Sequence, residues 1–261
     1  MLLCHGFLDH GRTWDFVVDA LAGSDLHLVA FDWRGHGQTA WVGEGGTYHF
    51  ADYLLDLADI VDAVARDRLH LCGHSMGGGV AAHYAGAFPA RVASLALLEG
   101  LGPPAGSFDE APERHVAFVT GARRERGRSR RPIATIDDAV RRVREAHPGI
   151  GEDAARHLAR NGTRPHEGGH GLDWRYDPMH RVTFPHPFYV AHAQAFWRRI
   201  RCPVLLVEGD ASPFAKLPDL DARRQALPHA TRAAITGAGH MMHVEAPHEV
   251  AAALVALWRG C

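Results

Sequence analysis

The sequence predicts an α/β fold, in which a mostly parallel, doubly wound sheet carries an inserted helical cap. Short, continuously apolar runs alternate with amphipathic helical patterns, as they do when helices cover both faces of parallel strands. This alternation stops between residues 101 and 199, where Gly- and Pro-rich joints separate helical segments. A chain of 261 residues suffices for one domain with such an insertion.

The alternating part of the chain predicts both strands and helices of the main domain. The predicted strands are Leu26–Phe31, Leu69–Cys72, Val92–Leu98, Pro203–Val207 and Ala230–Ile235. The predicted helices are Trp14–Leu21, Phe50–Ala65, Met76–Ala87 and Pro247–Trp258. We therefore assign residues 1–100 and 200–261 to the core and residues 101–199 to a helical cap.

The cap sequence predicts helices at Ile136–Ala146 and Glu152–Arg160 and no strand. The run Arg123–Arg131 contains six arginines. Because charge runs are usually solvated surface, we interpret this run as a mobile, solvated loop in preference to an anion-binding segment.

The composition excludes several classes of partner. Hydrophobic residues make up 46% of the chain, charged residues 22%, and the formal charge is −2. This balance does not favour nucleic acid or an anionic membrane as a partner. No apolar run approaches the ~20 residues of a membrane span, and the first residues, MLLCHGF, do not form a signal peptide. The four cysteines lack zinc-site spacing, so we expect a reduced, cytoplasmic setting without a metal or cofactor.

The segment LCGHSMGGG, residues 71–79, has the features of a nucleophile elbow. An apolar strand precedes Ser75 and an alanine-rich helix follows it. A serine on such a sharp turn needs small neighbours, and Gly73 and Gly77 supply them at positions −2 and +2. The N-terminus of the following helix favours an anion beside the serine. Ser75 is therefore the candidate nucleophile.

Four segments carry a resemblance to a known family. The elbow GHSMGG, the HGF of residues 5–7, FDWRGHGQT of residues 31–39 and GAGHMMHVEAP of residues 237–247 resemble motifs of the α/β-hydrolase superfamily, in the same order. The similarity covers nearly the whole chain apart from the insertion, which resembles the variable cap of that superfamily. It implies a serine hydrolase of the capped, esterase-like kind.

The resemblance also implies the groups that would support the nucleophile. The backbone N–H groups of Phe7 and Met76 would form an oxyanion hole for the tetrahedral intermediate. The three histidines His5, His36 and His74 would order loops rather than react.

His240 is the candidate general base. In this fold the triad runs in the order serine, acid, histidine, and His240 follows the last predicted strand on a Gly-rich turn. The competitor, His243, lies in a helical neighbourhood that favours a packing role.

The sequence leaves two candidates for the acid. Asp210 follows a strand, but many family members place their aspartate three residues after the glycine, where this chain has Ser212. Glu99 ends the preceding strand, as the acid does in certain relatives. We favour Glu99, because a carboxylate at an apolar strand end needs a partner and a histidine supplies one.

The predicted reaction is hydrolysis of a small to medium, partly apolar ester through an acyl-enzyme. Haloalkane dehalogenases and epoxide hydrolases of this fold use an aspartate nucleophile, so Ser75 argues against both. The alternatives are a C–C bond hydrolase or lyase with the same triad, and a non-catalytic small-ligand receptor. Aromatic residues cluster in the insertion at Trp174–Pro178 and Phe184–Tyr189. We expect most of them to pack the cap and some to line the pocket.

The start of the chain predicts a sheet of six parallel strands. Only MLL stands before Cys4, whereas the full fold has two more strands there. We interpret this as a start site placed too far downstream. Leu26–Phe31 should then form an exposed edge, and an apolar edge promotes self-association.

Overall fold

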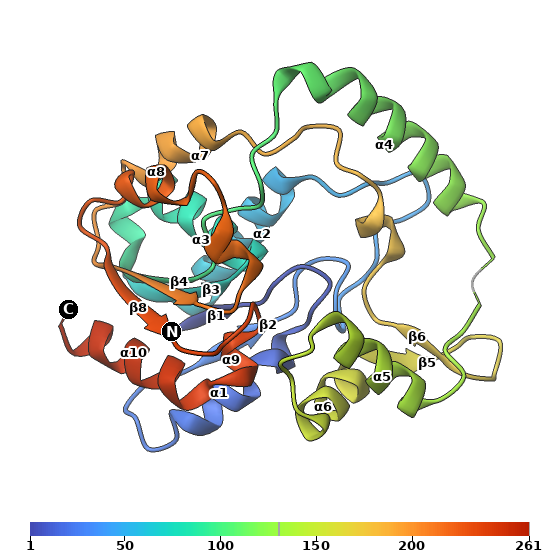
Figure 1. The fold of residues 1–261 in the computed structure, drawn as a ribbon, viewed down its shortest axis with the longest axis horizontal. Coiled ribbons are helices and arrows are strands. Elements are labelled where there is room, and N and C mark those ends of the chain that lie inside the picture. The colour runs from blue at the N-terminus through green and yellow to red at the C-terminus, as the bar shows by residue number, and fades with distance from the viewer. Residues whose placement is uncertain (130, 261) are drawn as a thin grey trace.

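The main sheet consists of six parallel strands in the order β2-β1-β3-β4-β7-β8 (Figure 1). The computed structural model describes residues 1–129 and 131–260. The strands are β1 (Leu2–Cys4), β2 (Val29–Phe31), β3 (Leu69–His74), β4 (Val92–Leu98), β7 (Val204–Gly209) and β8 (Thr231–Ile235). The predicted α/β fold is confirmed, and β2 forms one edge of the sheet as predicted. Self-association through that edge stays a prediction.

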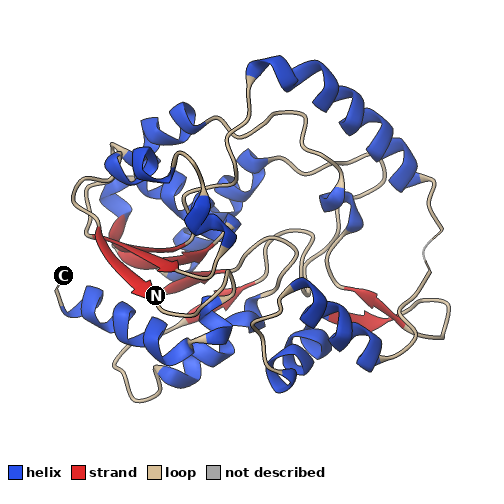
Figure 2. Cartoon of the chain, viewed as in Figure 1, coloured by secondary structure: helices blue, strands red, loops and turns tan. Residues whose placement is uncertain are grey.

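Helices cover both faces of the sheet (Figure 2). On one face lie α2 (Phe50–Val64), α3 (Met76–Ala87), α7 (Val190–Trp197) and α8 (Leu220–Gln225). On the other face lie α1 (Asp15–Ala20), α9 (Met242–Glu245) and α10 (Pro247–Arg259). Side chains alternate along each strand, so Leu71 of β3 packs into the first layer and Cys72 into the second. This two-sided burial explains why the central strands are apolar throughout.

The described residues of the segment between β4 and β7 add no strand to the main sheet. It contains α4 (Ala111–Arg126), α5 (Ile136–Ala146) and α6 (Glu152–Gly162), and a separate antiparallel pair formed by β5 (Thr163–Pro165) and β6 (Leu172–Trp174). Short 3₁₀ turns complete the fold: η1 (Gly11–Trp14), η2 (Pro89–Arg91), η3 (Phe108–Glu110), η4 (Pro178–Arg181) and η5 (Pro213–Lys216). We call residues 101–199 the insertion.

Two expectations for the insertion are wrong. The hairpin β5–β6 was not expected, because strands of three residues are too short to show an alternating pattern. The run Arg123–Arg131 is not wholly a loop, since α4 continues through Arg126. Arginine is a good helix former and its charge is favourable at a helix C-terminus. One member of the run, Arg130, lies outside the described residues, as does Cys261.

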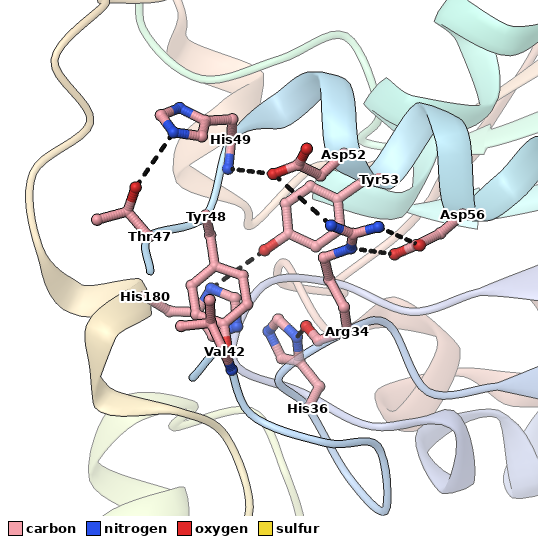
Figure 3. Close-up of polar contacts among 10 residues, drawn as sticks. All are labelled: Arg34, His36, Val42, Thr47, Tyr48, His49, Asp52, Tyr53, Asp56 and His180. Atoms are coloured by element: carbon pink, nitrogen blue, oxygen red, sulfur yellow. Dashed lines mark hydrogen bonds and ion pairs between the residues drawn. The ribbon is translucent and has the colours of Figure 1, made fainter. Parts of the chain in front are cut away.

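A buried polar cluster joins the insertion to the core, and Figure 3 shows its members Tyr48, Tyr53 and His180. Tyr48 donates to Asp177 Oδ2 over 2.8 Å and stacks on the ring of His180 with 3.7 Å between centroids. On the other side, the Tyr53 hydroxyl lies 3.1 Å from His180 Nδ1. Burial lowers the pKa of His180 to about 4, so the ring is neutral at pH 7.

A second, apolar contact ties α5 and α6 to the core. Ala139, Val140 and Leu158 of these helices pack in one cluster with Met241 and Val244. The insertion is therefore held next to the loop that carries His240. Among the described residues, no helix combines the length and the apolarity that a membrane crossing requires.

Candidate active site

Ser75 lies between the end of β3 and the start of α3, in a strained backbone conformation. Its φ of 51° and ψ of −117° fall in a region that residues other than glycine rarely adopt. A Cβ on Gly77 would come within 2.5 Å of the carbonyl oxygens of Cys4 and His5. A Cβ on Gly73 would meet the Gly77 backbone at 2.6 Å. Glycine at −2 and +2 is therefore what lets β3, α3 and the end of β1 come together at the serine.

The structure brings Glu99 to His240. Glu99 follows β4 with φ of 49°, and its side chain is only 2% exposed. Its Oε2 lies 2.5 Å from His240 Nδ1 and accepts a hydrogen bond from Ser212 Oγ over 2.7 Å. The backbone N–H of Gly209 donates to Oε1 over 3.3 Å. A carboxylate with three donors is satisfied despite its burial, and it fixes the orientation of the imidazole.

Asp210 lies elsewhere and has a different partner. It is exposed, and its Oδ1 accepts a hydrogen bond of 2.7 Å from the backbone N–H of Gly237. It therefore ties the loop after β7 to the loop that carries His240. Ser212, at the position where many relatives have their acid, instead supports Glu99. Sequence reasoning noted Ser212 only as a departure from the family pattern, and it did not assign this contact.

The neighbouring histidines are buried and make loop contacts. His74 Nε2 lies 2.8 Å from the backbone oxygen of His240, and His243 Nε2 lies 3.0 Å from Thr13 Oγ1. Burial lowers the pKa of His243 to about 3 and that of His74 well below its usual range, so both are neutral at pH 7.

His5 and His36 also hold loops at this edge of the sheet. The amide of Trp33 donates to His5 Nε2 over 3.1 Å, and the amide of Leu8 donates to His36 Nε2 over 3.2 Å. The hydrogen bond to His36 holds Leu8, which directly follows Phe7 and has a φ of 59°. These contacts fit the loop-ordering role expected for these histidines.

Phe7 and Met76 line the same cavity as Ser75. Met76 is the first residue of α3, so its N–H has no acceptor within the helix. Phe7 lies in the loop after β1, where its amide donates no hydrogen bond to a described backbone group. Both positions are compatible with donation to an oxyanion.

Two cavities meet at Ser75. One, of about 450 Å³, is apolar and includes Met76, Phe188, Trp197 and Phe214 in its lining. The other, of about 610 Å³, is more polar and includes His240, His147, Arg142 and Arg181. The insertion contributes to both linings, with Phe184 and Phe188 in the first and Trp174 and Tyr176 in the second. Aromatic residues of the insertion thus line pockets as well as pack.

Phe214 is a site residue that the sequence did not reveal. Its ring stacks on His240 with 4.5 Å between centroids and a 20° interplanar angle. Its position in η5 carries no motif, and the pairing of β7 with β8 brings the loops after these two strands together at the histidine.

Asp9, His74 and His243 are the described residues that could together hold a metal ion. One ligand atom from each lies within 4.8 Å of the others. Two imidazoles and a carboxylate suit a first-row transition metal, and burial keeps both imidazoles neutral. The chemistry open to Ser75, His240 and Glu99 needs no metal, since it requires only a base, a nucleophile and two N–H donors.

Comparison with known proteins identifies the family. The model of the alpha/beta hydrolase family matches residues 1–253. The chain belongs to this family. Its structure is similar to that of the hypothetical protein PA1622 from Pseudomonas aeruginosa PAO1, with 32% identity, a TM-score of 0.86, and coverage of 99% of this chain and 89% of that one. It is also similar to the thioesterase domain from the curacin biosynthetic pathway, with 25% identity, a TM-score of 0.85, and coverage of 98% and 90%.

Curated relatives of this alpha/beta hydrolase include serine hydrolase-like proteins. That of Dictyostelium discoideum is 27% identical over 81% of this chain, and that of Danio rerio is 29% identical over 65%. The chain spans only 60% and 52% of the lengths of these two proteins.

Proposed function

We propose that this alpha/beta hydrolase cleaves carboxylic esters through an acyl-enzyme on Ser75. The observation that carries the proposal is the arrangement at the carboxyl edge of the sheet. A serine held at positive φ shares a cavity with a histidine, and the Nδ1 of that histidine is paired with a buried carboxylate.

In the proposed reaction, Ser75 Oγ attacks the ester carbonyl and its proton passes to His240 Nε2. Glu99 holds the Nδ1 proton, so Nε2 is the basic nitrogen, and it stabilises the imidazolium that forms. The N–H groups of Phe7 and Met76 stabilise the oxyanion. The C–O bond then breaks as His240 returns the proton to the leaving alcohol. Water, activated by His240, releases the acid from Ser75.

The two cavities suggest how an ester is oriented. The general acid must reach the leaving oxygen, and His240 lines only the polar cavity. We therefore assign the leaving group to the polar cavity. The acyl group then enters the apolar cavity beside Met76, and about 450 Å³ suits a small to medium acyl chain. In this proposal the insertion acts as a cap over both groups.

The test combines labelling with turnover. A fluorophosphonate probe should label the wild-type protein, and the protein should hydrolyse p-nitrophenyl esters whose acyl chains have two to eight carbons. Ser75→Ala should abolish both and retain the unfolding temperature. Ser107→Ala is the matched control, since Ser107 caps η3 away from both cavities.

Each alternative predicts a different outcome. Labelling without turnover of any ester would contradict the ester assignment and favour C–C bond hydrolysis. Absence of labelling, with small-ligand binding unchanged in Ser75→Ala, would favour a receptor.

A further inference from the structure

A third cavity, of about 650 Å³, lies within the insertion and is rich in arginine. Its wall includes Arg124 from the C-terminal part of α4, Arg128 from the turn that follows, and Arg131 from the connection to α5. Arg142 of α5 and Arg181 of η4 complete the set. We call it the arginine cavity.

The acidic groups of the wall do not balance these charges. Against five arginines the wall has two carboxylates, Glu125 and Asp173. Asp173 is engaged by His166 Nδ1 at 2.8 Å, and Arg128 lies 3.7 Å from Glu125. No described acidic residue forms an ion pair with Arg124, Arg131 or Arg142. The cavity therefore has a formal charge near +3 when it is empty.

Several arginines of the insertion that lie outside the cavity are paired with acids. On α5, Arg141 lies 2.6 Å from Asp138 and Arg144 lies 3.7 Å from Glu152. On α6, Arg156 lies 2.8 Å from Asp137. Several surface arginines of the insertion thus have an acidic partner, whereas among the cavity arginines only Arg128 has a described one. The five arginines of the cavity are exposed, so water weakens their mutual repulsion, and a bound anion would offset what remains.

The arginine cavity adjoins the polar cavity of the active site. Arg142, Trp174, Tyr176 and Arg181 line both of them. Ser75 and His240 line the polar cavity, and His240 marks its leaving-group side. An ester bound at Ser75 can therefore extend its leaving group past Arg142 and Arg181 toward the remaining arginines.

We propose that the arginine cavity binds a phosphate group carried by the leaving group of the substrate. The assignment rests on the proposed ester hydrolysis and names the class of substrate: an apolar acyl group on a phosphorylated alcohol or thiol. Phosphate is favoured because it is multiply charged and accepts the forked hydrogen bonds of several guanidinium groups.

The test uses substrates that differ in one phosphate. Butyryl-pantetheine and butyryl-4′-phosphopantetheine release thiols that are measured by the same colorimetric reaction. We expect kcat/KM of the wild-type protein to be about tenfold or more higher for the phosphorylated thioester, since a charged hydrogen bond contributes roughly this factor. Salt should reduce the ratio, because it screens exposed charges.

Variants locate the effect. In Arg124→Gln and Arg142→Gln the ratio of the two kcat/KM values should fall about fivefold each. Arg144→Gln is the matched control on α5, where the arginine pairs with Glu152 outside the cavity, and it should keep the wild-type ratio. A second pair of substrates tests whether a carboxylate can replace the phosphate. The kcat/KM for the butyryl thioester of 3-mercaptopropionate, which carries a carboxylate, is compared with that for the butyryl thioester of N-acetylcysteamine, which is neutral.

The outcomes separate this inference from the proposed function. A ratio near one with normal turnover would overturn the phosphate assignment and leave ester hydrolysis standing. A larger effect of carboxylate than of phosphate would also overturn it. If no ester or thioester is cleaved, the proposed function fails. Calorimetric titration with 4′-phosphopantetheine against pantetheine then tests the cavity by itself, and equal or absent binding of the two would refute it.

Discussion

Replacing Glu99 with glutamine should remove most of the activity while the fold survives. The carboxylate accepts from His240 Nδ1 and Ser212 Oγ on Oε2, and from the Gly209 amide on Oε1. Glutamine offers one oxygen and one NH₂ group. If its NH₂ faces His240, Nδ1 must accept and Nε2 carries the proton, so the base is in the wrong tautomer. If its NH₂ faces Gly209 instead, this group and the backbone N–H of Gly209 are both donors, and neither has an acceptor.

We expect Glu99→Gln to lower kcat by about 10⁴-fold, or about 5.5 kcal/mol of transition-state stabilisation, as loss of a triad acid can. The mispaired donors should lower the free energy of unfolding by only about 1–3 kcal/mol. Turnover of p-nitrophenyl butyrate and urea denaturation measure the two effects.

Asp210→Asn is the control for this comparison, because its Oδ1 contact with the Gly237 amide can be kept by an amide oxygen. Its kcat should stay within about threefold of wild type, since a rate factor of three is under 1 kcal/mol. Near-normal kcat in Glu99→Gln, or a comparable loss in Asp210→Asn, would refute the assignment of the acid.

Three further changes test how the fold supports the site. Ser75→Gly should abolish activity yet raise the free energy of unfolding by about 1 kcal/mol, because glycine relieves the positive φ; a lower unfolding temperature would contradict the strain. Gly77→Ala should destabilise the protein by about 2 kcal/mol or more, because its Cβ would meet backbone oxygens of β1 at 2.5 Å, and thermal unfolding measures this. The pKa of His180 is about 4 in the folded state against about 6.5 unfolded, so the unfolded state binds the proton first as pH falls. The contribution of His180 to the free energy of unfolding should therefore be complete above pH ~6.5 and should fall by about 3 kcal/mol toward pH ~4. In His180→Gln, the urea midpoints at these two pH values should differ by less than they do in the wild-type protein.

Most of the fold could be predicted from the sequence because the relevant patterns are local. Continuous apolar runs marked the central strands, and α3 and α5 begin and end at the predicted residues. The hairpin β5–β6 and the helix α4 were missed. Three-residue strands have no visible period, and the arginine run of α4 was interpreted as surface charge instead of helix.

The sequence by itself determined that Ser75 occupies a strand–turn–helix elbow, since the small residues that this turn requires are adjacent in the chain. Only the tertiary structure decided what surrounds that serine. Glu99 reaches His240 because β4, β7 and β8 are successive neighbours in the sheet, and Phe214, which follows β7, stacks on the same ring because β7 pairs with β8. The arginine cavity likewise depends on α4, α5 and η4 lying around one space. A local pattern depends on residues that are adjacent in the chain. The contact between Glu99 and His240, which are 141 positions apart, depends on how the strands pack in the sheet.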